Sequence, residues 1–179
     1  MTGIARGSLL LLPILALLAV APLFAKEGKT MTEMKMSSPA FVHTKAIPSK
    51  YSCDGDDLNP PLAIEGVPKE AKSLALVMDD PDAPGGVWVH WVLWNIDPAT
   101  AQIAQGSVPA GAHQGVNSWE RTGYGGPCPP SGMHRYYFRL FALKERLELP
   151  SSTTRKELDR AMQGKILARC ELLGTYSRK

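Results

Sequence analysis

The stretch VWVHWVLWNI at residues 87–96 decides the fold class of this chain. Its apolar residues are mostly β-branched or aromatic, and such residues favour strands over helices. Two further stretches have a similar character, SLALVM at residues 73–78 and HRYYFRLFAL at residues 134–143. The first of these is almost continuously apolar, as expected of a strand that is covered on both faces. The chain is therefore predicted to be mainly β.

Residues 134–143 also show the alternation of a strand with two different faces. Side chains along a strand point alternately to opposite faces. One face is expected to carry His134, Tyr136, Phe138 and Leu140, and the other Arg135, Tyr137 and Arg139.

One helix is expected late in the chain. The segment from Thr154 to Glu157 fits a capping box, in which the two side chains each bind the other's backbone amide. Residues at helical spacing follow it, namely Leu158, Ala161, Met162, Lys165, Ile166 and Arg169. Residues 170–176 are then predicted to form a closing strand. Many short strands, 16 glycines, 15 prolines and one helix favour a β-sandwich.

Composition excludes several classes of protein. The chain is 44% apolar and 21% charged, which argues against a disordered or fibrous protein. Its 20 Lys and Arg against 17 Asp and Glu form no basic stripe, so no nucleic-acid partner is expected. No internal repeat is visible.

The first 25 residues have the layout of a secretory signal. Arg6 precedes an apolar run at residues 9–24, and Ala25 ends a sequence that resembles a signal-peptidase site. Pro13 and Pro22 interrupt the run, which is shorter than the ~20 residues needed to span a bilayer. We expect cleavage after Ala25, a periplasmic or secreted protein, and no stable membrane insertion afterwards. Residues 26–39 are expected to be a flexible linker, and residues 40–179 one domain.

None of the three cysteines is spaced as CxxC. Because we expect an exported protein, we consider these cysteines in an oxidising compartment. Cys53 and Cys128 both lie in loops rich in Gly and Pro, so a disulfide between them is a hypothesis. Cys170 lies in an apolar segment and is expected to be a small buried side chain.

Polar groups that interrupt the apolar strands indicate a binding pocket. Asp79, Asp80 and Asp82 follow one strand within the sequence DDPDAP, and His90 and His134 lie in the other two. A loop from Gly125 to Met133, GGPCPPSGM, leads into His134 and gives a ligand access to backbone amides. Imidazoles and amides are hydrogen-bond donors, so the expected ligand is an oxyanion such as phosphate.

The segments DDPDAP, WVHW and GGPCPPSGMHRYYF, together with the CDG turn at residues 53–55, resemble the phosphatidylethanolamine-binding protein (PEBP) family. The similarity is to its bacterial, Raf-kinase-inhibitor-like branch of YbhB/YbcL type and covers residues 41–176. It implies an antiparallel β-sandwich with few helices. It also implies an anion pocket, whose residues match Asp80, His90, Gly126, Pro127, His134 and Tyr136 here. Structural support is expected from Asp82, Trp88 and Arg135, and Arg135 could pair with a carboxylate.

The resemblance favours a binding protein with no cofactor and no metal, whose partner is a small anionic or phosphorylated ligand such as a phospholipid head group. A metal-dependent hydrolase that uses His90, His134 and Asp80 is the alternative, because two histidines and one carboxylate can hold a metal. No HExxH, GxSxG or Walker sequence supports it. A third class is an inhibitor or modulator of another protein, for which the sequence specifies no partner. The C-terminal gate of eukaryotic members does not transfer, because the chain stops soon after Tyr176.

Overall fold

The structure, a computed structural model, describes residues 1–3 and 33–178, and the chain divides into residues 1–30 and 31–179. Residues 4–25 of the expected signal peptide and residues 26–32 of the expected linker lie outside the described residues. Within the described part, no helix is both long and apolar enough to cross a membrane.

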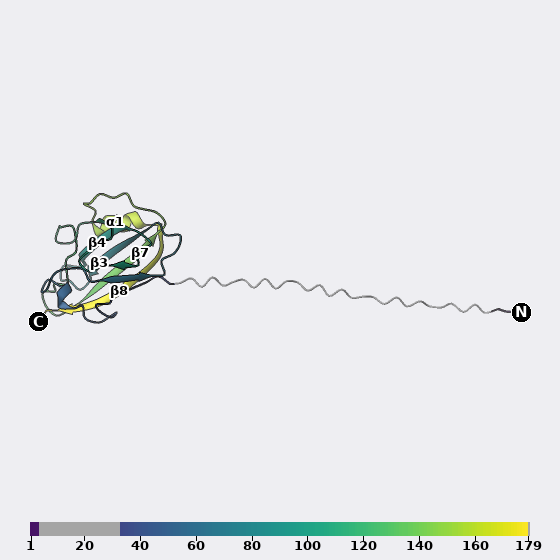
Figure 1. The fold of residues 1–179 in the computed structure, drawn as a ribbon, viewed down its shortest axis with the longest axis horizontal. Coiled ribbons are helices and arrows are strands. Elements are labelled where there is room, and N and C mark those ends of the chain that lie inside the picture. Colours follow the sequence, from purple (N-terminus) through teal and green to yellow (C-terminus); the bar gives the residue numbers. More distant parts are fainter. Residues whose placement is uncertain (4–32, 179) are drawn as a thin grey trace. The chain divides into compact units, whose positions relative to one another are not determined.

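The second unit consists of two antiparallel sheets, with strand orders β1-β2-β5 and β6-β4-β3-β7-β8, and the central strands of the larger sheet are seen in Figure 1. The elements in chain order are β1 (Lys35–Ser37), the 3-10 turn η1 (Ser49–Tyr51), β2 (Leu62–Glu65), β3 (Ser73–Asp80), β4 (Trp88–Ile96), β5 (Gln102–Ile103), β6 (His113–Gln114), β7 (Met133–Leu143), α1 (Arg155–Met162) and β8 (Ile166–Ser177). The mainly β, antiparallel fold predicted from the sequence and the family resemblance is confirmed.

Strand β3 has a separate core on each of its faces. Leu74, Leu76 and Met78 belong to the cluster that also holds Ile64 of β2 and lies between the sheets. Ala75 and Val77 belong to a second cluster together with Leu158 and Met162 of α1. All eight residues of β3 are buried, as expected of a strand covered on both faces.

The expected alternation in β7 is also confirmed. His134, Tyr136, Phe138 and Leu140 are buried, whereas the residues between them are exposed or half-buried. This alternation brings His134 and Tyr136 to the inner face, near the end of the sandwich where β7 begins.

Three expectations about local structure need correction. Strand β1 pairs with β2, and Met34 and Met36 are buried, so the domain begins before the expected linker end at residue 39. Helix α1 has the expected capping box at Thr154 but ends at Met162, because Gly164 takes a positive φ of 69° and the chain turns into β8. Cys170 is half-buried rather than buried.

Candidate functional site

Three of the six expected pocket residues, Asp80, His90 and His134, meet where β3 ends and where β4 and β7 begin. A cavity of about 210 Å³ lies there, and its lining includes Asp80, His90 and His134. The rest of the lining is Ala83, Pro84, Trp88, Trp119, Cys128 and Pro130. Three stretches that are far apart in sequence therefore contribute their polar groups to one small hollow.

Asp80 and His134 form the best-defined polar contact of the cavity. Nδ1 of His134 lies 2.7 Å from Oδ2 of Asp80, and the two residues are 7% and 3% exposed. A carboxylate only accepts hydrogen bonds when it is ionised, so Nδ1 of His134 carries the proton. The other carboxylate oxygen of Asp80 accepts the backbone N–H of Asp82 at 2.8 Å. Both oxygens of Asp80 are thus engaged, and Nε2 is the ring nitrogen of His134 left for a ligand.

His90 reaches the cavity because of a β-bulge. Met78 of β3 lies opposite Trp91 while Asp79 lies opposite Val89, so His90 is an extra residue in β4. Bulges redirect side chains at the ends of sheets. Val89 packs in the outer cluster and Trp91 in the inner one, whereas His90 contacts Tyr136 edge-on at 5.2 Å between ring centroids.

The backbone of Gly125 orients the ring of His90. Nδ1 of His90 lies 2.6 Å from the carbonyl oxygen of Gly125, and the N–H of Gly125 donates to the carbonyl of His90 at 3.0 Å. A carbonyl only accepts, so Nδ1 is again the protonated nitrogen. Burial lowers the pKa of His90, although the hydrogen bond to Gly125 and the charge of Asp80 oppose that shift. A ring that is neutral in this tautomer offers the lone pair of Nε2.

Tyr136 lies behind the cavity rather than on its lining. Its side chain is fully buried, and its hydroxyl has no hydrogen-bond partner in the described part of the chain. Burial raises the pKa of Tyr136, and the charge of Asp80 raises it further. The structure places the ring of Tyr136 against His90, and its role in ligand binding stays a prediction.

Gly126 and Pro127 are also absent from the cavity lining. Gly126 faces the turn at residues 51–57, where a Cβ on it would lie 2.5 Å from the carbonyl oxygen of Tyr51. Its N–H donates to Oδ1 of Asp57 at 2.6 Å, and the carbonyl of Pro127 accepts the N–H of Cys53 at 3.1 Å. The structure thus places these two residues where they fasten the loop to the neighbouring turn. Cys128 and Pro130 are the loop residues that reach the cavity.

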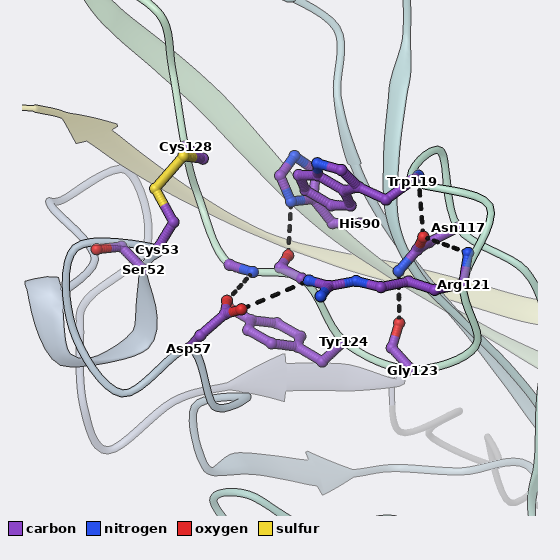
Figure 2. A network of polar contacts seen from close by, with 12 residues as sticks. Ser52, Cys53, Asp57, His90, Asn117, Trp119, Arg121, Gly123, Tyr124 and Cys128 are labelled. Atoms are coloured by element: carbon purple, nitrogen blue, oxygen red, sulfur yellow. Dashed lines mark hydrogen bonds and ion pairs between the residues drawn. A yellow bond between two sulfur atoms is a disulfide. The ribbon is translucent and has the colours of Figure 1, made fainter.

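Cys53 and Cys128 form a disulfide, with 5.4 Å between their Cα atoms. The disulfide that was a hypothesis from the sequence is therefore present, and it joins the two loops covalently. Figure 2 shows this bridge on one side of the loop and His90 on the other.

Trp119 is the wall residue that sequence reasoning missed. It lies edge-on to His90 and to Trp88, with ring centroids 5.0 and 5.4 Å away. Asn117 holds the turn that carries it, since its Oδ1 accepts the N–H of Trp119 at 3.0 Å and its Nδ2 donates to the carbonyl of Gly123 at 3.0 Å (Figure 2). No motif in the sequence marked Trp119, because its position depends on the fold of this turn. Trp88, expected only as support, also lines the cavity.

Asp82 and Arg135 stabilise the rim from outside the cavity. Arg135 donates to both oxygens of Asp82, through Nε at 2.9 Å and Nη2 at 2.7 Å. These hydrogen bonds lower the pKa of Asp82 to about 2. Arg135 therefore has the carboxylate partner that the sequence analysis anticipated.

The described residues contain no group of three or more His, Cys, Asp and Glu arranged to hold a metal ion. His90, His134 and Asp80 share a cavity, but both carboxylate oxygens of Asp80 already accept hydrogen bonds within the protein. The geometry does not support the metal-site alternative.

Comparison with known proteins identifies the family. Residues 37–177 match the family described as Phosphatidylethanolamine-binding protein. The chain belongs to the PEBP family. The match includes every residue of the cavity lining, so the site lies wholly within the PEBP domain.

Relatives and solved structures agree with this PEBP assignment. A UPF0098 protein of Methanothermobacter thermautotrophicus is 47% identical over 150 residues, covering 81% of this chain and 99% of the relative. A PEBP homologue from Chlamydia trachomatis has a crystal structure with a TM-score of 0.80 and 42% identity, covering 83% of this chain and 99% of that one. The E. coli protein YbcL has a TM-score of 0.77 and 29% identity, with 82% and 99% covered.

Proposed function

We propose that this PEBP-family protein is an exported binding protein whose cavity takes a small phosphate-type anion. The observation that carries the proposal is the pairing of two buried histidines in one cavity, each with Nδ1 fixed by an acceptor of the protein itself. Both rings are thereby left with Nε2 for a ligand.

The fixed tautomers predict which form of the anion binds. A neutral ring in either position offers a lone pair at Nε2, whereas a protonated ring offers an N–H donor. The dihydrogen phosphate monoanion can meet both, because it carries hydroxyl donors as well as acceptor oxygens. Phosphate carries more of these hydroxyl groups as the pH falls. Binding is therefore expected to strengthen as the pH falls from 8 to 6.

The lining of the cavity limits both the size and the affinity of the ligand. A volume of about 210 Å³ suits a head group rather than a drug-sized molecule. The cavity lining includes no Lys or Arg, and its walls are largely aromatic and Pro side chains. Without such a cation, we expect free phosphate to bind weakly, with a Kd of about 1 mM.

Export and the absence of catalysis are parts of the same proposal. The disulfide near the cavity supports an oxidising compartment, which agrees with the signal-like N-terminal sequence. A binding role is favoured over metal-dependent hydrolysis because both oxygens of Asp80, the one carboxylate in the cavity lining, already accept hydrogen bonds within the protein. Phosphatase and esterase screens with and without added divalent metal should find no turnover.

Calorimetry with inorganic phosphate tests the binding proposal. We expect tighter binding at pH 6 than at pH 8, and loss of binding in His134→Gln. His113→Gln serves as a matched control, because His113 is exposed on β6 outside the cavity. Tighter binding at pH 8, or equal binding by His134→Gln and the wild type, would refute the proposal.

A further inference from the structure

The loop at residues 124–128 is fastened along its length to the turn at residues 51–57. The hydroxyl of Tyr124 donates to the carbonyl of Tyr51 at 2.8 Å, and Asp57 accepts the N–H of Gly126 at 2.6 Å. The N–H of Cys53 donates to Pro127, and the Cys53–Cys128 disulfide closes the series. Figure 2 shows the bridge and Asp57 on the same side of this loop.

The loop and the turn are in close backbone contact. A Cβ on Gly126 would lie 2.5 Å from the carbonyl oxygen of Tyr51 and 2.8 Å from Cα of Ser52. Only glycine leaves room for this approach. The position of the loop is consequently set by the turn.

The other side of the same loop determines the orientation of His90. Gly125 both accepts from Nδ1 of His90 and donates to its backbone carbonyl. Cys128 itself lines the cavity beside His90. A change at the disulfide can therefore reach His90 through only three intervening loop residues.

We propose that the Cys53–Cys128 disulfide is a positioning element of the anion pocket, and that its reduction by a dithiol weakens anion binding. This inference rests on the proposed function. In the reaction a thiolate of the dithiol attacks one sulfur of the bridge and forms a mixed disulfide. The second thiol of the reagent then attacks this mixed disulfide and releases the cysteine. Two electrons and two protons pass to Cys53 and Cys128, and the reagent leaves as a disulfide.

The location of the bridge makes this reaction accessible. Cys53 lies at an exposed position, and Cys128 is half-buried at the cavity. Once the bridge is cut, the loop keeps only hydrogen bonds, each worth about 1 kcal/mol. The freed ends regain conformational entropy, and His90 loses its fixed acceptor for part of the time.

The first experiment measures phosphate binding at pH 6 before and after treatment with a dithiol. It uses a Cys170→Ser background, because Cys170 is the remaining free cysteine of the described chain. We expect affinity to fall about ten-fold on reduction. Equal affinity in the oxidised and reduced proteins, with circular dichroism showing both folded, overturns the inference.

A second pair of variants covers the case in which the reduced protein loses its fold. Asp57→Ala removes the acceptor of Gly126 but leaves the disulfide intact, and should also weaken binding. Asp57→Asn keeps an acceptor oxygen and should restore it. If Asp57→Ala binds phosphate as tightly as the wild type, the loop does not position His90 and the inference fails.

Nitrogen NMR of His90 supplies a readout that needs no ligand. In the oxidised protein Nδ1 should be the protonated nitrogen of a neutral ring, and reduction should increase the Nε2–H tautomer. An unchanged tautomer after reduction contradicts the inference even if phosphate binds. No phosphate binding by the oxidised protein would instead remove the proposed function itself.

Discussion

The three aspartates of the DDPDAP segment differ in their surroundings although they lie within four positions. Asp79 faces the outer side of β3 and is paired with Arg139 and with Arg155 of α1. Asp80 faces the cavity and holds His134, whereas Asp82 holds Arg135 at the rim. Alternation along a strand explains why neighbours point to different partners. We therefore expect substitution of each of the three aspartates to have a different effect on binding or stability.

Replacing Asp80 with Asn should weaken phosphate binding at both pH 6 and pH 8. The side-chain amide of Asn can accept from Nδ1 of His134 or donate to it, so it no longer fixes the tautomer that leaves the lone pair at Nε2. We expect phosphate affinity to fall about ten-fold at each pH. Calorimetry at the two pH values measures this, and wild-type affinity in the variant would mean that Asp80 does not orient His134 for the ligand.

The pair of Asp82 and Arg135 should stabilise the fold above about pH 4 only. Arg135 lowers the pKa of Asp82 from 3.8 to about 2. The contribution of the pair to the free energy of unfolding is therefore present above pH 3.8 and is lost as the pH falls towards 2. Arg135 is 52% exposed and Asp82 28% exposed, so solvent limits the effect to below about 1 kcal/mol.

Urea unfolding of Arg135→Ala at several pH values checks this prediction. The free energy of unfolding of the variant should be lower than that of the wild type, and this deficit should shrink as the pH falls from 4 to 2. A deficit that stays constant over this range would mean that Arg135 acts through packing instead of charge.

Among the elements, helix α1 shows how far local sequence determines structure. Its beginning was predictable, because Thr154 and Glu157 form both hydrogen bonds of the capping box. Its end was not, because apolar and basic residues continue at helical spacing through Ile166 and Arg169. In the structure Ile166 begins β8, which adds the fifth strand to the larger sheet. Pairing with β7 thus outweighs local periodicity at this point.

Thr154→Ala should lower the free energy of unfolding by about 1 kcal/mol, because it removes the side-chain oxygen that caps α1. Phosphate binding should not change, because Thr154 lies outside the cavity. Denaturant unfolding measures the first effect, with the exposed neighbour Ser151→Ala as the control. If Thr154→Ala and Ser151→Ala lower the free energy of unfolding equally, the cap at Thr154 makes no specific contribution.

Strand β4 gives a second limit of sequence-based prediction. The polar interruption at His90 was visible in the sequence, but the bulge that turns its ring inward is not encoded in a local motif. Trp119 was missed for the same reason, since the turn held by Asn117 brings it to the cavity. Alternation predicted the faces of β7 correctly, because its pairing with β8 is regular at His134 and Tyr136.

At the scale of the whole molecule, the cavity forms where two loops and three strand ends converge. The sequence analysis identified the loop at residues 125–133, but it could not distinguish residues that line a cavity from residues that hold the loop in place. Gly126 and Pro127 contact the turn at residues 51–57, and Cys128 links that turn to the cavity. Such distinctions depend on tertiary packing, which sequence spacing does not contain.

A crystal structure of the protein grown at pH 6 in phosphate tests the binding claim most directly. We expect a phosphate in the cavity, with oxygens within hydrogen-bond distance of Nε2 of both His90 and His134. Phosphate bound only elsewhere, for instance beside Arg139 and Arg155, with the cavity occupied by water alone, would contradict it.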